Sequence, residues 1–444
     1  MTNPKMELHN SKIQEIAKQI REKASSEEKA HIDKGGVPHV VPLPGDKRRT
    51  GKPIRIQGLK EILEINTEKQ ICCAEPGVTF ASLVKATLPL GLVPKVVPEL
   101  EGITIGGAVA GCSVESMSYR YGGFHDSCLE YEIIRSDGEI ITVEKDSFLF
   151  EMIHGSYGTL GILSKLTFEL IPAKPYIHIT YKKFASFGEF QKALLGHCQS
   201  GDYPFVDAIV HSPKEFVLCL GDFTDAPAYV SNYRWLKIFY KSTKRRTEDY
   251  LATYDYFFRY DTECHWLTKT IPILENKIVR FLLGRWVLGS SNLIAWSKRL
   301  EFFLKMKKRP EVVCDVFIPS ARFEEFFQWY EKDFDFYPLW VIPYCFPKQY
   351  PWLDEKYAQK IGENLVIDCA IYGKSNARKD VDYSQLLEEK TIELNGIKTL
   401  ISRNHFTKEK FWSIYNHSHY EKAKGILDPK GLFPDLYDKF HKIR

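Results

Sequence analysis

The sequence lacks any run of about 20 apolar residues, the length that a membrane-spanning helix needs. The nearest approach, residues 281–289, carries Arg285 in its middle, so this segment is expected to lie on a membrane at most and not to cross one. The first 20 residues also lack the apolar core of a secretory signal peptide. The chain is therefore predicted to be cytoplasmic, with peripheral membrane association as its only membrane contact and no transmembrane segment.

The sequence also lacks the motifs that are typical of metal sites and nucleic-acid sites. The ten cysteines are scattered and form neither a CxxC pair nor a Cys/His cluster at zinc spacing, so no metal is expected and the thiols are predicted to be reduced. Lys and Arg total 61 against 57 Asp and Glu, which excludes a surface devoted to nucleic acid. No GxGxxG motif follows a strand, which excludes a Rossmann-type nucleotide site.

Aromatic residues, in contrast, are abundant: 24 Tyr, 28 Phe and 8 Trp make up 14% of 444 residues. Such side chains bind planar or apolar ligands, but they also fill large cores. Residues 233–266 contain eleven aromatics, with basic residues concentrated in the first half. Three interpretations compete for this segment: a membrane-surface patch, a nucleic-acid face, or an aromatic core beside solvated charges. The last is favoured for the basic run 244–246.

Apolar periodicity predicts alternating short helices and strands. In the first part these are a helix around 13–20, a hairpin over 62–76, a helix from 80 to 91, a hairpin over 131–143 and a strand over 166–172. The prolines that follow predict a boundary at 173–175. The later elements are strands near 176–181 and 205–220, helices to about 310, strands at 311–318, 338–345 and 364–372, a helix at 322–334 and a C-terminal helix from 411.

The most informative segment is 98–123, which contains six glycines set between apolar positions. Glycine permits a positive φ and removes the Cβ that would keep a ligand from backbone N–H groups. Successive free N–H groups form an anion site suited to a diphosphate, whereas the alternative interpretation is a tight turn. A second cluster, Gly155-Ser-Tyr-Gly-Thr-Leu-Gly161, precedes a strand, and the two clusters flank one hairpin.

These motifs together resemble a known family. Thr104-Ile-Gly-Gly107, Tyr121-Gly122, Gly158-Thr-Leu-Gly-Ile162 and Asp428-Pro-Lys-Gly-Leu-Phe433 resemble the vanillyl-alcohol-oxidase type of FAD enzyme. Within it the sequence is most similar to Δ24-sterol reductases and their plant relatives, from about residue 55 to the C-terminus. The resemblance implies an α+β fold: a bipartite FAD-binding domain of the PCMH type with an inserted α+β cap domain over the flavin. The implied parts are an N-terminal helix (1–34), the FAD domain (35–174), the cap (175–410) and a C-terminal segment packing back on the FAD domain (411–444).

The resemblance also implies the FAD-binding residues. Gly106, Gly107 and Gly111 would let the backbone approach the diphosphate, and Tyr121 and Gly122 would lie nearer the flavin ring. The implied set is Thr104, Ile105, Gly106, Gly107, Ala108, Val109, Ala110, Gly111, Cys112, Ser113, Val114, Glu115, Ser116, Tyr121, Gly122, Gly158, Gly161 and Ile162. His39 lacks the motif that attaches FAD covalently in many relatives, so non-covalent FAD is expected.

The implied reaction is reduction of an isolated C=C bond in the side chain of a sterol or isoprenoid, as in steroid biosynthesis, with NADPH as electron donor. Such a reduction needs a hydride and a proton donor. Arg403 is a candidate for stabilising the reduced flavin, and Tyr372 or His405 for donating the proton. The alternatives are an FAD oxidase or dehydrogenase of a sugar or alcohol, and a flavin-fold protein that does not turn over. The expected partner is an apolar small molecule and not a nucleic acid, and the residues predict no particular oligomeric state.

Overall fold

The first sheet holds the glycine-rich segments. The structure, a computed structural model, describes residues 4–24, 29–35, 51–299 and 309–441. Six strands form an antiparallel sheet in the order β3-β4-β8-β6-β7, with β5 pairing with β8. Its elements are β3 (Ile62–Asn66), β4 (Ile71–Ala74), α2 (Phe80–Thr87), η1 (Leu88–Leu90), β5 (Leu92–Pro94), α3 (Ile105–Gly111), α4 (Ser118–Tyr121), η2 (Phe124–Ser127), β6 (Cys128–Ile134), β7 (Ile140–Glu144), α5 (Phe148–Ile153) and β8 (Ile162–Pro172). Both predicted hairpins and the predicted helix and strand are confirmed.

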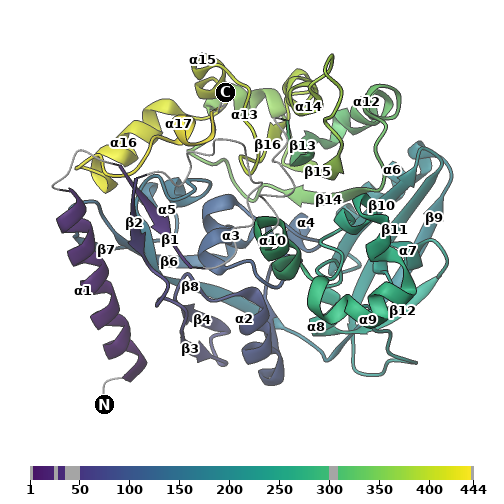
Figure 1. The fold of residues 1–444 in the computed structure, drawn as a ribbon, viewed down its shortest axis with the longest axis horizontal. Coiled ribbons are helices and arrows are strands. Elements are labelled where there is room, and N and C mark those ends of the chain that lie inside the picture. The colour runs from purple at the N-terminus through teal and green to yellow at the C-terminus, as the bar shows by residue number, and fades with distance from the viewer. Residues whose placement is uncertain (1–3, 25–28, 36–50, 300–308, 442–444) are drawn as a thin grey trace.

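The N-terminal helix α1 (Pro4–Ala24) lies along one side of this sheet (Figure 1). Its predicted apolar stripe is confirmed, because Ile13, Ile16, Ala17 and Ile20 are all buried. The stripe packs in one cluster with Phe433 from the far end of the chain. Two short parallel strands, β1 (Ala30–Asp33) and β2 (Lys52–Arg55), form a separate small sheet.

An eight-stranded antiparallel sheet makes up the second half, in the order β12-β9-β11-β10-β14-β15-β13-β16. The chain passes from the first sheet to this one between Pro172 and Tyr176. Its strands are β9 (Tyr176–Phe184), β10 (Phe205–Ser212), β11 (Glu215–Thr224), β12 (Glu248–Ala252), β13 (Val312–Pro319), β14 (Leu339–Cys345), β15 (Leu365–Lys374) and β16 (Ile397–Lys398). The expectation of helices alone between 220 and 310 is wrong at β12, which extends the sheet edge by pairing with β9.

The two faces of this sheet differ. Val316, Val341 and Cys369 point into an apolar core shared with α6 (Phe187–Ser200), α12 (Phe323–Trp329) and α14 (Tyr383–Glu393). Residues of the opposite face, such as Phe317 and Trp340, join the core of the first sheet. The remaining helices are α7 (Phe239–Thr243), α8 (Thr253–Phe257), η3 (Leu267–Thr270), η4 (Pro272–Glu275), α9 (Lys277–Val287), α10 (Ser290–Arg299), η5 (Ser320–Arg322), the π-helical turn η6 (Tyr330–Phe334) and α13 (Glu355–Ile361).

The C-terminal segment returns to the first sheet, with α15 (Lys408–Trp412), α16 (His417–Leu427) and α17 (Leu436–Phe440). Figure 1 shows α16 and α17, in yellow, beside β1 and β2. Lys424 donates its ammonium to the Thr159 carbonyl at 2.8 Å, and Lys439 to the Tyr157 carbonyl at 2.5 Å. These contacts fasten the end of the chain to the second glycine cluster.

The aromatic segment 233–266 is largely core. Tyr233, Phe239, Tyr256 and Trp266 are buried, which confirms the aromatic-core interpretation for them. The basic residues beside them form ion pairs: Lys244 with the part-exposed Glu215 (2.6 Å) and Arg246 with the buried Asp249 (2.9 Å). The α+β class predicted from the sequence is confirmed.

Candidate active site

The first glycine cluster forms the start of a short helix. Thr104 caps α3, and its Oγ1 accepts the Gly107 N–H at 3.3 Å. Gly106, Gly107 and Gly111 are helical, so the positive φ expected of this loop is wrong for them. Close approach explains the glycine at 106 instead, because a Cβ there would lie 2.5 Å from the Pro76 Cβ.

Lys34 lies over this helix start. Its Nζ is 3.5 Å from Thr104 Oγ1 and 3.8 Å from the position that a Cβ of residue 107 would occupy. A cation beside a glycine backbone and a capping hydroxyl is a suitable set of donors for a phosphate group. Sequence reasoning missed Lys34, although it begins the basic, glycine-rich stretch before residue 53.

The segment that follows α3 enters the second half of the molecule. Cys112 ends the helix in the left-handed region, at φ 54°. Ser116 is buried; its carbonyl accepts the Val206 N–H at 2.9 Å, and its hydroxyl lies 3.4 Å from the Tyr256 hydroxyl. Residues 112–116 therefore connect the glycine helix directly to β10 and α8.

The other predicted glycines are required for two different structural reasons. Gly122 and Gly158 have φ of +77° and +73°, which other residues rarely adopt, so the expected conformational need is real at these two positions. Gly161 permits close packing, because a Cβ would lie 2.9 Å from Ile133 Cγ2. Ile162 begins β8 and is buried, and the Tyr121 ring lies 5.6 Å from the Lys95 ammonium.

A mainly apolar cavity lies where three parts of the chain meet. The first half contributes the end of α3 and the loop before β8, the second half contributes β13, β14 and the turn after β16, and the C-terminal helices close it. Its walls include Gly111, Cys112, Met152, His154, Gly155, Tyr157, Phe317, Tyr344, Phe346, Trp352, Lys398, Thr399, Leu400, Trp412, Tyr415 and Leu436. Two predicted FAD residues, Gly111 and Cys112, thus line the same space as aromatic side chains of the eight-stranded sheet, which is called the cap sheet below.

Buried charges lie between the glycine segment and the cap sheet. Arg259 is 2% exposed and contacts the carboxylates of Glu115 at 3.0 Å and Asp207 at 3.2 Å. Trp340 and Tyr260 also donate hydrogen bonds to Asp207. Burial raises the pKa of Glu115 to about 7, although the Arg259 guanidinium opposes the shift.

A second group of buried polar side chains extends along the same sheet face. His265 Nε2 lies 2.8 Å from Glu99 Oε1, and the His265 ring stacks on Tyr372 at 4.2 Å. Tyr372 donates its hydroxyl to Asp315 Oδ1 at 2.6 Å. Burial raises the pKa of Asp315 to about 6. The Asp315 N–H donates to Thr399 Oγ1, and Thr399 lines the cavity, so this group borders it.

Comparisons with known proteins agree with this geometry. A family model described as "FAD binding domain" matches residues 25–144. Human Delta(24)-sterol reductase is 29% identical over 452 residues, covering 98% of this chain and 87% of the relative. The Arabidopsis thaliana Delta(24)-sterol reductase is 27% identical over 90% of this chain and 78% of its own length. Cytokinin dehydrogenase 9 of rice (Oryza sativa subsp. japonica) is 29% identical over 29% of this chain.

Along most of its length the chain is thus similar to Delta(24)-sterol reductases, and residues 25–144 match an FAD-binding domain. The glycine helix with its capping hydroxyl and Lys34 fits the diphosphate of FAD, and the adjoining apolar cavity with its aromatic walls fits a flat ring system. The individual FAD-binding residues and the domain limits remain predictions. His39, on which the expectation of non-covalent FAD rests, lies outside the described residues.

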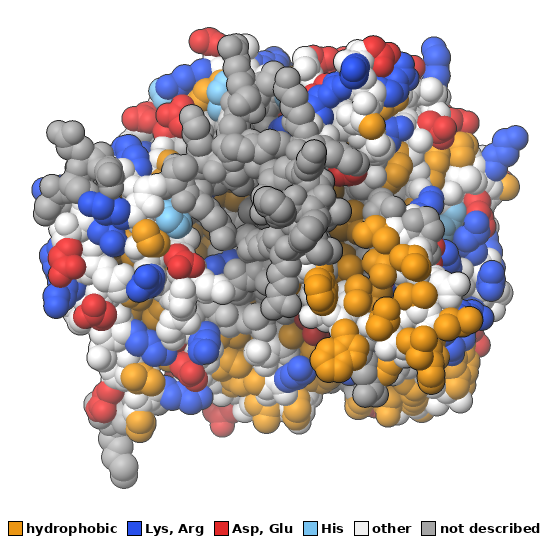
Figure 2. All heavy atoms as spheres, in the orientation of Figure 1, with side chains coloured by type: hydrophobic (Ala, Val, Ile, Leu, Met, Phe, Trp, Pro, Cys, Tyr) orange, Lys and Arg blue, Asp and Glu red, His pale blue; other side chains and the backbone are white. Residues whose placement is uncertain are grey.

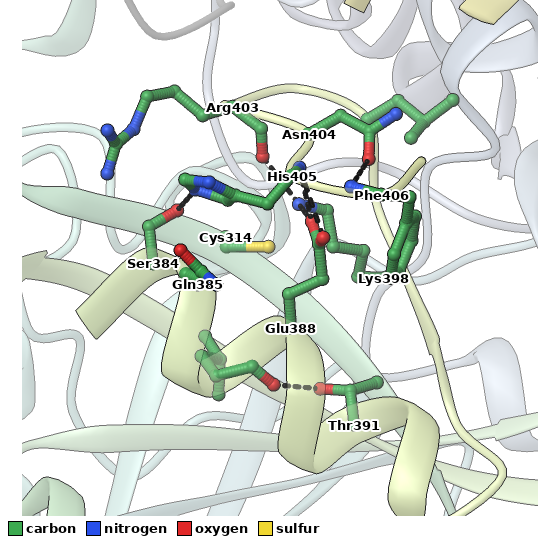
Figure 3. Close-up of polar contacts among 12 residues, drawn as sticks. Cys314, Ser384, Gln385, Glu388, Thr391, Lys398, Arg403, Asn404, His405 and Phe406 are labelled. Atoms are coloured by element: carbon green, nitrogen blue, oxygen red, sulfur yellow. Dashed lines mark hydrogen bonds and ion pairs between the residues drawn. The ribbon is translucent and has the colours of Figure 1, made fainter. Parts of the chain in front are cut away.

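The three predicted catalytic residues occupy two places. Tyr372 belongs to the buried group beside the cavity. Arg403 and His405 lie near α14 instead (Figure 3): Arg403 pairs with Asp382 at 2.5 Å, and the His405 ring lies 3.3 Å from Ser384 Oγ. The structure does not bring the three together, and each role remains a prediction.

Figure 3 also shows a buried ion pair, Lys398 with Glu388, beside these two residues. Lys398, which lines the cavity, binds Glu388 at 2.5 Å, and Glu388 accepts the His405 N–H. Lys398 also donates to the Arg403 carbonyl. Arg403 and His405 are thus linked to the cavity wall through Lys398.

Sequence reasoning missed Asp207, Asp315 and Arg259 as site residues. A signal for the aspartates exists: Asp207 and Asp315 are lone acids in apolar strands, in Phe-Val-Asp-Ala-Ile-Val and Val-Val-Cys-Asp-Val-Phe. An unpaired charge in such a strand is costly, so it indicates a buried partner or a function. Within the described ranges, no group of His, Cys, Asp and Glu is arranged to hold a metal ion.

Proposed function

We propose that this protein is an FAD-dependent oxidoreductase that reduces an isolated C=C bond in the side chain of a sterol or similar isoprenoid, with NADPH as donor. One observation carries the proposal: the glycine helix α3, which has Lys34 and Thr104 at its start, ends at an apolar, aromatic cavity bordered by buried acids. The similarity to Delta(24)-sterol reductases along 98% of the chain supports the same reaction class. FAD, when bound, carries a hydride from a donor to an acceptor carbon.

The protein's own residues would share the work. Lys34, Thr104 and the Gly107 backbone would hold the diphosphate. Phe317, Tyr344 and Trp352 would enclose the apolar substrate and exclude water. Burying hydrocarbon gains about 0.8 kcal/mol per methylene, so such walls bind the hydrocarbon tail of a sterol without many hydrogen bonds.

The apolar walls also weigh against the sugar oxidase alternative. Each unpaired buried polar group costs about 1–3 kcal/mol, so a sugar site needs many converging polar side chains. Most cavity-lining side chains here are apolar or aromatic. A protein that binds FAD without turnover would need no acidic cluster beside the cavity.

Anaerobic reduction tests the function directly. We expect NADPH to bleach the oxidised-flavin absorbance of the purified protein, and a sterol or polyprenyl alkene to restore it. Saturated analogues of the same lipids are the control and should leave the flavin bleached. Bleaching by a sugar or alcohol, with recovery on adding no alkene, would favour the oxidase or dehydrogenase, and no bleaching by any donor would favour the non-catalytic alternative.

An apolar surface supports reversible membrane association, which we include in the proposal. Helix α9 exposes Ile278, Phe281, Leu282 and Trp286, with Trp286 74% exposed. Its Arg280, in contrast, is buried and pairs with Glu263 at 2.6 Å. Figure 2 shows orange side chains gathered at the lower right, where Figure 1 places α9 and α10. A helix that exposes several large apolar side chains suits a lipid surface better than water. No helix within the described residues is long and apolar enough to span a bilayer.

The double variant Phe281→Ser, Trp286→Ser should lower the fraction of protein that sediments with liposomes at least about tenfold, because each lost aromatic contact weakens apolar burial by about 1.5–3 kcal/mol. Reduction of a detergent-dispersed alkene should stay unchanged. The matched control is Leu8→Ser, which removes an exposed apolar group from α1 instead of α9. Equal sedimentation of the double variant and the control would contradict a membrane role for α9.

A further inference from the structure

Asp368 lies on the sheet face that borders the cavity. It is the fourth residue of β15, directly opposite Phe317 of β13 and Ile342 of β14. Side chains at opposite positions of antiparallel strands point to the same face, with Cβ atoms about 5 Å apart. Phe317 lines the cavity, so the Asp368 carboxyl lies one residue away from the space that would hold the substrate.

The environment of this carboxyl is unusual. Asp368 is 2% exposed, and its Oδ1 is buried with no hydrogen-bond partner among the described residues. A charged carboxylate in such surroundings would cost several kcal/mol, so the neutral acid is favoured. Burial raises the pKa of Asp368 well above its ordinary value, and the nearby carboxylates of Asp315 and Glu99 add to the shift.

Its acidic neighbours differ from it because they have partners. Glu99 is paired with His265, which contributes to a pKa below the ordinary value although burial opposes it. Asp315 accepts a hydrogen bond from the Tyr372 hydroxyl. The site thus contains one acid, Glu99, whose ionised form is favoured by its partner. It also contains one acid, Asp368, whose neutral form is favoured because it lacks a partner. Such an arrangement separates acid from base roles.

We propose that Asp368 is the proton donor for reduction of the C=C bond. The inference rests on the proposed function. One alkene carbon takes a hydride from the reduced cofactor and the other takes the Asp368 proton, so the π bond is replaced by two C–H bonds. Both hydride electrons enter the product. The Asp368 carboxylate that remains recovers a proton from solvent before the next turnover.

Tyr372 is less suited to this role. Its hydroxyl proton already lies in a 2.6 Å hydrogen bond to Asp315, and its ring is stacked on His265. Burial raises the pKa of the Tyr372 hydroxyl well above its ordinary value, which makes it a poor acid. A proton on Asp368 Oδ1, in contrast, would have no hydrogen-bond acceptor among the described residues.

The test compares Asp368→Asn with Tyr372→Phe. Asparagine keeps the shape of the aspartic acid but has no acidic proton. We expect Asp368→Asn to bind FAD and to be bleached by NADPH at the wild-type rate, while flavin reoxidation by the alkene slows at least about 100-fold, the usual contribution of a positioned acid. Tyr372→Phe should slow reoxidation less. Asp368→Glu, which retains an acid, should react faster than Asp368→Asn and covers a failure of the latter to fold.

Infrared spectroscopy supplies a readout that needs no turnover. The wild-type minus Asp368→Asn difference spectrum at neutral pH should contain the C=O stretch of a protonated carboxylic acid, and this band should shift in D2O. Absence of the band, or alkene reoxidation of Asp368→Asn at the wild-type rate, would overturn the proposal. If no alkene reoxidises the wild-type flavin, the proposed function fails instead, whatever the infrared result.

Discussion

Replacing Gly107 with valine is expected to lower the affinity for FAD by about 100-fold. The Cβ would lie 3.1 Å from Thr104 Oγ1 and 3.8 Å from Lys34 Nζ, so the branched valine would fill the space that these two groups share. Two hydrogen bonds to a charged phosphate are worth about 1.5 kcal/mol each, which together correspond to that factor. The measurement is a titration of the apoprotein with FAD, followed by flavin fluorescence after acid release.

The matched control is Gly196→Val. Gly196 is also helical, but it lies on α6, and a Cβ there meets nothing within 4 Å. This variant should keep its full flavin content. Wild-type affinity in Gly107→Val would show that the start of α3 does not bind the diphosphate.

Arg259→Met is expected to destabilise the folded protein by about 3–5 kcal/mol, because it leaves the carboxylates of Glu115 and Asp207 buried without their cation. The loss should shrink as the pH falls toward about 7. Burial raises the pKa of Glu115 to about 7 although Arg259 opposes the shift, so without Arg259 this pKa lies higher still, and the folded variant takes up a proton above pH 7 that removes the charge on Glu115. Chemical denaturation at pH 6 and pH 8.5 measures both effects.

Lys244→Met supplies the comparison. Lys244 also pairs with a carboxylate, that of Glu215, but the two side chains are 42% and 37% exposed. Pairs that retain contact with water contribute about 1 kcal/mol or less, so this variant should lose little stability. An equal loss of stability in the two variants would mean that burial does not increase the contribution of the Arg259 ion pairs to stability.

Local patterns predicted the elements well where short-range interactions decide them. The stripe of Ile13, Ile16 and Ile20 needs only one apolar surface to pack against, and it is buried in one cluster with Phe433. β12 was missed because Tyr250 and Leu251 follow a basic run and read equally well as part of a helix. Pairing with β9, a tertiary contact, decides for the strand.

The candidate site was predictable in its glycines but not in its acids. Gly122 and Gly158 have the positive φ that a glycine in a sequence suggests. Glycine is required at 106 for another reason, because Pro76, thirty residues earlier, leaves no room for a Cβ. Asp315 and Asp368 meet only because β13 and β15 are paired in one register. Sequence periodicity places each acid on a strand, but it does not specify which face will border the cavity.

The origin of the cavity walls from distant parts of the chain determines when the site can form during synthesis. Gly111, Tyr344 and Leu436 line one space although more than two hundred residues separate the first two. During synthesis the first sheet can fold early, but its glycine helix faces an open side until the cap sheet and α17 have left the ribosome. Closure over such long loops is slow, so cofactor capture belongs to the end of folding. Nascent polypeptides stalled before residue 436 would therefore hold a folded first sheet and an unfinished site.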